Sequence, residues 1–261
     1  MVDTLRFLRA LLRTSLRASA SLRGAFLLQA CFMFVNNLTF FSVWWIFFQR
    51  FPEIRGWRLP DLAALYGITA FSIGFVLVFG GGVRYLARMI VDGELDPLLT
   101  QPKSVLLHVL GSNSRPSGWG DMISGFGLVL FSGHAHGTNL ALVVLFFATS
   151  AIVFFGAAVM AQSLAFWLGP VDNLSWQLVE FVVTFSVYPQ TVYPPYLKVV
   201  LFTLIPGGFV SYLPVTILRN FQPTLLLTVV AGAIAYGSLA VFVFYRGLRV
   251  YESGNRIGPR S

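Results

Sequence analysis

Long apolar runs alternate with short polar segments along the chain, a pattern typical of a protein that crosses a bilayer several times. Runs of about 20 residues or more occupy 24–48, 62–83, 140–168 and 224–245, and this is the length that a membrane-spanning helix needs. Two shorter apolar runs occupy 122–132 and 174–187. Counted as spans, they bring the total to six. The pattern therefore predicts an all-α polytopic membrane protein with one transmembrane domain over residues 1–261.

The fifth apolar region is interrupted, which leaves two interpretations of its path. Residues 188–196 are rich in Tyr and Pro, and the apolar stretch that follows is broken by Pro206-Gly207-Gly208. The region forms either two spans, giving seven in total, or one span followed by a segment that enters and leaves the same face. Because 14 residues (174–187) are short for a span, we favour six spans with a folded-back outer segment over 188–215.

Residues 3–23 have the periodicity of an amphipathic helix. Arginines recur at helical spacing, and leucines follow the same spacing one position earlier: Arg6, Arg9, Arg13 and Arg17 against Leu5, Leu8, Leu12 and Leu16. Such a helix lies in the headgroup plane, with its apolar face down and its arginines toward anionic lipid. We therefore expect an interfacial helix here. Packing of the apolar face on a soluble partner is the alternative.

The composition and the placement of charge support this topology. Charged residues make up 11% of the chain and apolar residues 56%, whereas soluble domains carry about 25% charged residues. A soluble domain and a disordered chain are thereby excluded, and the single Cys31 excludes a disulfide framework. Thirteen of the 18 Lys and Arg residues lie before the first span, between the second and third, or after the sixth. Because basic residues favour cytoplasmic loops, both termini are predicted to be cytoplasmic, and the net charge of +8 indicates orientation rather than nucleic-acid binding.

No pattern in the sequence predicts a catalytic residue, a metal site or a nucleotide site. The phosphate-binding loop G-x-x-x-x-G-K-[ST] does not occur. His134 and His136 lie in a short outer turn with no Cys and no carboxylate at ligand spacing. Gly80-Gly81-Gly82 ends an apolar run, and we interpret it as a close-packing or helix-ending site. No cofactor is therefore expected on this chain.

Several polar side chains inside the predicted spans are candidates for a pathway or a subunit interface. They are Asn36, Asn37, Gln162 and Glu180. A carboxylate within a bilayer is costly and usually faces a cavity or a partner, so Glu180 is the most informative of the four. Alternatively, these side chains form hydrogen bonds between helices or lie close enough to the membrane surface to be hydrated.

The polar segment 84–120 contains a short stretch that combines acids with leucines. Its acids are Asp92, Glu94 and Asp96, and its leucines are Leu95, Leu98 and Leu99. We expect a short amphipathic helix from Glu94 to Gln101, beginning after Gly93 and ending before Pro102. A surface helix of this kind suits docking into a groove on another protein. A hydrated loop whose leucines touch lipid is the alternative.

Three stretches of the chain resemble the ABC-2 type permeases. They are Phe51-Pro52-Glu53-Ile54-Arg55-Gly56-Trp57, the segment Asp92-Gly93-Glu94-Leu95-Asp96 with Leu99 and Pro102, and the Tyr-Pro-rich segment 188–196. More narrowly, the chain is similar to six-span bacterial permeases that are encoded in pairs beside an ATPase. The resemblance covers nearly the whole chain and implies a location in the bacterial inner membrane.

The resemblance also implies a role for each segment. Residues 3–23 resemble the interfacial connecting helix, and 188–215 resemble the folded-back helices that cap the pathway. The coupling helix, which seats in a cleft of the ATPase, would include Gly93, Glu94, Leu95, Asp96, Leu98 and Leu99. ATP and Mg would be bound by that ATPase subunit, and a second homologous permease would complete the assembly.

Two functions from different classes remain open on these grounds. The first is the permease subunit of an ATP-driven exporter of a lipophilic or amphipathic compound. The second is an integral membrane enzyme that acts on lipid or lipid-linked substrates and uses Glu180 or the outer histidines. An ion-coupled carrier would need ionisable residues deep in several spans, and Glu180 alone does not meet that need.

Overall fold

The computed structural model describes residues 2–137 and 139–252, and over these residues the chain is helical with no β-strand. The helices are α1 (Val2–Ser19), α2 (Arg23–Arg50), α3 (Leu59–Phe79), α4 (Leu86–Val91), α5 (Asp96–Leu99), α6 (Val105–Gly111), α7 (Ser117–Phe131), α8 (Asn139–Ser163), α9 (Ala165–Leu168), α10 (Asp172–Ser186), α11 (Pro195–Thr203), α12 (Leu213–Arg219) and α13 (Pro223–Leu248). Two 3₁₀ segments, η1 (Gly81–Tyr85) and η2 (Gln190–Val192), and a π-helical segment, η3 (Gly208–Tyr212), connect them. Arg256 and Arg260, which the prediction of orientation uses, lie outside the described residues.

Four helical segments among the described residues are long and apolar enough to cross a membrane. They are α2, α3, Asn139–Leu168 (α8 with α9) and α13. The chain is therefore a multi-pass membrane protein. Helices α7 and α10 have 15 residues each, which corresponds to about 22 Å against a hydrocarbon core of about 30 Å.

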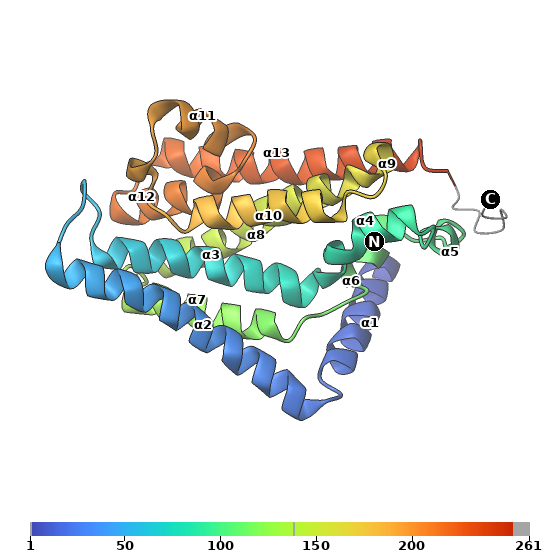
Figure 1. Ribbon diagram of the computed structural model, residues 1–261, viewed down its shortest axis with the longest axis horizontal. Coiled ribbons are helices and arrows are strands. Elements are labelled where there is room, and N and C mark those ends of the chain that lie inside the picture. Colours follow the sequence, from blue (N-terminus) through green and yellow to red (C-terminus); the bar gives the residue numbers. More distant parts are fainter. Residues whose placement is uncertain (1, 138, 253–261) are drawn as a thin grey trace.

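Most of the long helices lie roughly along one axis, and α2 is inclined to it (Figure 1). Helices α2, α3, α7, α8, α10 and α13 run beside one another, and successive members run in opposite directions. At one end, called here the α5 end, α4, α5 and α6 gather, and α1 runs steeply away from the bundle axis. At the other end, the α12 end, lie α11 and α12. Helix α1 and the last turn of α13 are thus at the same end of the bundle.

Helix α7 is held against α3 by glycines that allow the two backbones to approach closely. A Cβ atom added at Gly67 would lie 2.6 Å from the carbonyl oxygen of Gly125, and one at Gly74 would lie 2.5 Å from that of Gly118. On each helix the two glycines are seven residues apart, so they lie on one face. Small residues promote close helix packing in membranes, which explains how a short helix is fixed in the bundle.

Residues 188–215 form short helices at the α12 end instead of one long helix. Ser211 Oγ donates to the carbonyl of Ser186 at the end of α10 (2.6 Å), and Ser150 Oγ on α8 donates to the carbonyl of Val210 (2.7 Å). The Tyr212 hydroxyl donates to the carbonyl of Phe185. Side-chain donors thus satisfy the backbone of a region where regular helical bonding is interrupted, as a low-dielectric environment requires.

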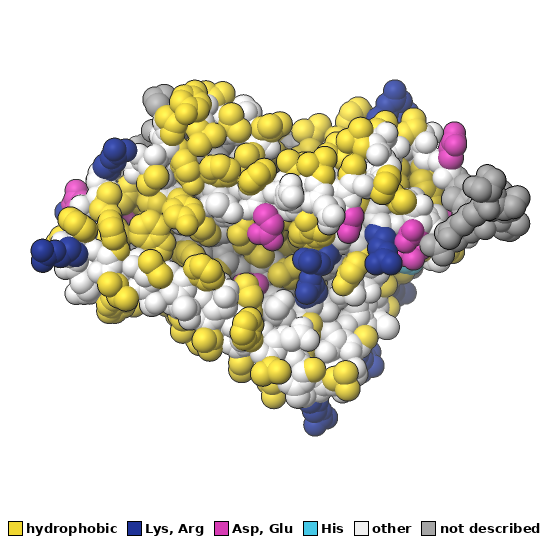
Figure 2. Space-filling view, viewed as in Figure 1, with side chains coloured by type: hydrophobic (Ala, Val, Ile, Leu, Met, Phe, Trp, Pro, Cys, Tyr) yellow, Lys and Arg dark blue, Asp and Glu magenta, His cyan; other side chains and the backbone are white. Residues whose placement is uncertain are grey.

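The surface of the bundle is largely apolar between its two ends. Helices α2 and α13 are the least buried of the candidate spans, and their exposed side chains include Leu27, Leu28, Phe32, Val35, Leu227, Ile234 and Phe242. Figure 2 shows hydrophobic side chains over much of the upper and left part of one face, while acidic and basic side chains lie near its middle and at both ends. This distribution suits contact with lipid or with another membrane protein.

Candidate functional site

A polar cavity of about 460 Å³ lies between α2, α3, α7, α8 and α10. Its polar and aromatic lining comprises Asn36, Asn37, Phe40, Trp44, Tyr66, Thr69, Arg84, Ser117, Asp121, Phe154, Trp176, Glu180, Thr184 and Tyr188. Three of the polar residues predicted within the spans, Asn36, Asn37 and Glu180, therefore face one space. The rest of the lining is apolar, and a cavity whose apolar and aromatic walls carry polar groups is typical of small-molecule binding.

Asp121 is the most deeply buried acid of the cavity lining, with 2% of its surface exposed. The Asn37 side-chain amide donates to Asp121 Oδ1 (2.7 Å) and to Ser124 Oγ (2.9 Å). Asp121 Oδ2 has no hydrogen-bond partner among the described residues. One carboxylate oxygen is thus held by α2, and the other is buried. The sequence pattern does not single out Asp121, because the apolar run begins one residue later, at Met122.

Glu180 and Arg84 occupy a more open part of the same cavity. Glu180 is exposed on α10, and Trp176 lies one turn before it on the same helix. The Arg84 guanidinium lies 4.0 Å from the centroid of the Trp176 ring, which is within the range of a cation–π contact. An acid, a base and several aromatic rings therefore border one opening beside α10.

Gln162 is not part of this cavity. Its side chain is fully buried, and its Oε1 accepts a hydrogen bond from the Ala87 backbone N–H (3.2 Å). Ala87 is in the first turn of α4, where backbone donors have no partner within the helix. Gln162 thus forms a hydrogen bond between helices, which is the alternative that the sequence left open for these side chains. Gln162 connects α8 to α4 instead.

The loop between α4 and α5 is shaped by Gly93. This residue has a φ of +75°, and the Glu94 N–H donates to the carbonyl of Met89 (2.9 Å), which is a common way for a helix to end at glycine. Helix α5 then begins at Asp96 and ends at Leu99. It is thus shorter than the predicted helix from Glu94 to Gln101.

The leucines of this segment do not share one exposed face, as a docking surface on one helix would require. Leu95 is fully buried and belongs to an apolar cluster with Ile90 and Leu106, because it precedes α5 in the turn that Gly93 starts. Leu98 is half-buried, and Leu99 is 47% exposed. Pro97 and Leu99 are therefore the exposed residues of α5, Glu94 is exposed in the turn before it, and Leu95 packs beneath them.

Two tyrosines in and just after α13 form hydrogen bonds on the two sides of α5. The Tyr251 hydroxyl, just after α13, donates to Asp96 Oδ1 (2.8 Å), and the Tyr245 hydroxyl is 2.7 Å from Ser104 Oγ. Burial and the Asp96 carboxylate raise the pKa of Tyr251 to about 12. The Tyr251 phenol therefore remains a protonated donor at neutral pH.

We expect Tyr251→Phe to lower the free energy of unfolding by about 1–3 kcal/mol, because it removes a hydrogen bond to a carboxylate. Thermal unfolding in detergent at pH 7 measures this loss. The matched control is Tyr85→Phe, since Tyr85 is exposed at the same end of the bundle. Equal midpoints for the two variants would contradict the structural role of Tyr251.

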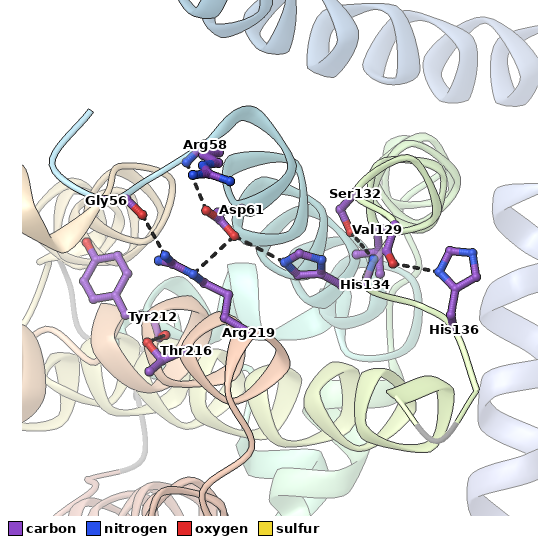
Figure 3. Close-up of polar contacts among 11 residues, drawn as sticks. Gly56, Arg58, Asp61, Val129, Ser132, His134, His136, Tyr212, Thr216 and Arg219 are labelled. Atoms are coloured by element: carbon purple, nitrogen blue, oxygen red, sulfur yellow. Dashed lines mark hydrogen bonds and ion pairs between the residues drawn. The ribbon is translucent and has the colours of Figure 1, made fainter. Parts of the chain in front are cut away.

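A second polar network connects several elements at the α12 end (Figure 3). Asp61, in the first turn of α3, accepts a hydrogen bond from the Arg58 backbone N–H at Oδ2 (3.0 Å). Its Oδ1 lies 3.4 Å from Arg219 Nε and 3.3 Å from His134 Nε2. Arg219 comes from α12 and His134 from the loop before α8. One buried carboxylate thus joins three parts of the chain that are far apart in sequence.

The segment 51–58 completes this network. Arg55 and Gly56 have positive φ angles, of 48° and 82°, and they form a turn between α2 and α3. Arg219 Nη2 donates to the Gly56 carbonyl, and Arg55 Nη1 donates to the Thr191 carbonyl, each at 2.7 Å. The stretch Phe51–Trp57, singled out by its resemblance, therefore holds α12 and η2 beside the start of α3.

The two histidines of the loop before α8 do not converge on one site. His134 faces Asp61, whereas His136 Nδ1 lies 2.7 Å from the Gly133 carbonyl oxygen (Figure 3). Within the part of the chain that the structure describes, no group of three His, Cys, Asp or Glu residues is placed to hold a metal ion. His134 thus takes part in the network around Asp61.

Comparison with known proteins identifies the family. The model of a family described as "ABC-2 family transporter protein" matches residues 34–255. No curated protein and no solved structure gives a match. The family match supports a transport subunit over the membrane enzyme. The chain belongs to the ABC-2 family of transporter proteins, as a multi-pass membrane permease.

Proposed function

We propose that this chain is the permease subunit of an ATP-driven exporter, working with a separate ATPase and a second permease in the bacterial inner membrane. The observation that carries the proposal is α5. It is a single exposed helical turn at one end of the bundle. Leu95, just before it, packs in the apolar cluster with α4 and α6, and Asp96 accepts a hydrogen bond from Tyr251 just after α13. A subunit that pushes on this turn would therefore move the bundle.

In this proposal the chain crosses the membrane six times, and both termini are cytoplasmic. Helices α7 and α10 take the third and fifth positions, since they run along the bundle axis and pack against longer neighbours. The arginines of α1, together with Arg84, Arg88 and Arg115, lie at or near the α5 end. Basic residues favour the cytoplasmic side, which supports placing the α5 end in the cytoplasm.

Movement of α5 would reach the membrane helices by two connections. Leu95 packs beside α4, which is bonded to α8 through Gln162 and Ala87. Tyr251 and Tyr245 connect the α5–α6 segment to α13. Closure of the ATPase on ATP and Mg would bias the permease between two arrangements of these packed elements.

The polar cavity is the proposed place where cargo enters the pathway. Its lining combines aromatic and aliphatic side chains with polar groups, which suits a lipophilic or amphipathic compound. It lies beside α2 and α10, and the exposed apolar surface of α2 is available to a second permease or to lipid. Helices α11 and α12 would cap the outer end of the pathway.

The substitution Leu99→Arg tests the role of α5. Leu99 is exposed, so the variant should fold, but a charge should prevent seating in an apolar cleft. After co-expression with the ATPase encoded beside it, we expect association to weaken about 30-fold or more, which is the scale of an interface hot spot. Pull-down and permease-dependent ATPase activity measure this effect.

Leu22→Arg is the matched control. Leu22 is 73% exposed and lies in the turn between α1 and α2, so the same change is made on the same side of the membrane but away from α5. Association of the Leu99→Arg variant at the strength of the control would exclude α5 as the docking element. Failure of the unmodified chain to bind any ATPase would contradict the proposed function as a whole.

A further inference from the structure

A second cavity, of about 560 Å³, lies beneath α1. Its walls come from α3, α8 and α13, and α1 and α6 close it toward the α5 end. The lining is apolar throughout: Leu8, Leu12, Phe75, Val76, Phe79, Gly80, Leu106, Leu107, Leu110, Gly111, Ala148, Ala151, Ile152, Phe155, Gly156, Val159, Gly237, Ala240 and Val241. Ile152 and Val241 are each 46% exposed, so the cavity is bordered by the surface that faces lipid.

One edge of the apolar face of α1 packs against α6. The Phe7 and His108 rings are 4.5 Å apart, and a Cβ atom at Gly111 would lie 2.5 Å from Leu11 Cδ2, so this edge packs tightly on α6. The next residues, Leu8 after Phe7 and Leu12 after Leu11, line the cavity instead. Helix α1 therefore covers the apolar cavity and also packs against α6.

From residue 4 to its end at Ser19, α1 carries only positive charge. Arg9 follows Leu8 directly and precedes Leu12 by three residues, so it lies beside both leucines, and Arg6, Arg9, Arg13 and Arg17 are all exposed. The sequence has no Asp or Glu from residue 4 to residue 52. None of the ion pairs among the described residues involves α1. These cations are thus available to an anion at the edge of the cavity.

We propose that this cavity binds an acyl chain of an anionic phospholipid, whose phosphate group is held by the arginines of α1. Protein interiors are close-packed, and an apolar space of this size beside lipid-facing helices is suited to a hydrocarbon chain. The basic face selects an anionic headgroup over a zwitterionic one. The site depends on the helices lying in a bilayer and not on which compound is transported.

The test uses the full chain, purified in detergent, and two lipids with the same acyl chains, dioleoyl phosphatidylglycerol and dioleoyl phosphatidylcholine. We expect phosphatidylglycerol to raise the unfolding midpoint and to be retained in native mass spectra. Ala148→Phe, which fills the cavity from an exposed position, should remove both effects. Arg9→Gln with Arg13→Gln should weaken the binding of phosphatidylglycerol about tenfold or more and abolish its advantage over phosphatidylcholine.

Ala141→Phe is the matched control for the cavity-filling variant. Ala141 is exposed on the same face of α8, seven residues before Ala148, and it does not line the cavity. It should retain the midpoint shift of the wild type. Equal effects of the two lipids on the wild type, or a full shift in Ala148→Phe, would overturn the proposal. Because the assay needs no ATPase, a negative result here is separate from failure of the proposed transport function.

Discussion

Gly125→Val is expected to prevent formation of the stable bundle. A Cβ atom at this position would lie 2.6 Å from the carbonyl oxygen of Gly67 and 2.5 Å from the backbone nitrogen of Phe71. Backbone atoms cannot move aside as a flexible side chain can, so α7 would have to separate from α3. We expect a loss of about 3 kcal/mol or more, a large part of the stability of a folded domain. The fraction of monodisperse protein in detergent and its unfolding midpoint measure the effect.

Gly127→Val provides the matched control on the same helix. No atom lies within 4 Å of a Cβ added at Gly127, and this residue is exposed. The control should therefore yield monodisperse protein with the midpoint of the wild type. If Gly125→Val behaved in the same way, the close approach of α3 and α7 would be disproved.

Asp61→Ala should be the most damaging single change in the network at the α12 end. It removes the carboxylate that accepts from the Arg58 backbone N–H and faces both Arg219 and His134. Loss of the helix cap and loss of a buried partner together should cost about 2–4 kcal/mol. Chemical or thermal unfolding in detergent measures the loss. Because Arg219 is on α12, limited proteolysis should also show faster cleavage near residue 220.

Glu53→Gln is the control for charge removal in the same region. Glu53 pairs with Arg58 at 2.9 Å, but both side chains are substantially exposed, and such pairs contribute about 0–1 kcal/mol. A double-mutant cycle between Asp61→Ala and Arg219→Ala measures the free energy of the Asp61–Arg219 ion pair. It thereby separates that contribution from the hydrogen bond between Asp61 and the Arg58 backbone N–H. If Asp61→Ala were no more harmful than Glu53→Gln, α12 would not be fixed through this carboxylate.

The local patterns of the sequence predict helices and faces well. The arginines of α1 are exposed, whereas Leu8, Leu12 and Leu16 are half-buried, so the basic and apolar sides of the helix differ as their spacing indicates. Gly82 packs closely against another part of the chain, as we expect for the Gly80-Gly81-Gly82 stretch. A Cβ atom at Gly82 would lie 1.7 Å from the carbonyl oxygen of Val109. The faces of α1 depend on the spacing of residues along one helix, and the packing at Gly82 depends on the absence of a side chain. Both kinds of information are contained in the sequence alone.

Predictions that required knowledge of a partner were less complete. Gln162 was grouped with Asn36 by polarity, but it bonds to Ala87 instead. Leu95 shares helical spacing with Leu99, but the turn at Gly93 places it in the core. Asp61 and Asp121 each directly precede an apolar run, so hydropathy alone assigns them to loops.

The sequence by itself determined which segments are apolar enough to enter a bilayer, which face of α1 is basic, and the family of the protein. These properties follow from the free energy of transferring each residue into a bilayer, which depends on the residue and its near neighbours. Only the tertiary structure decided that Asn37 meets Asp121, that Asp61 meets Arg219, and that α3 and α7 meet at glycines. Such contacts join residues far apart in the chain, and they depend on how closely two backbones can approach.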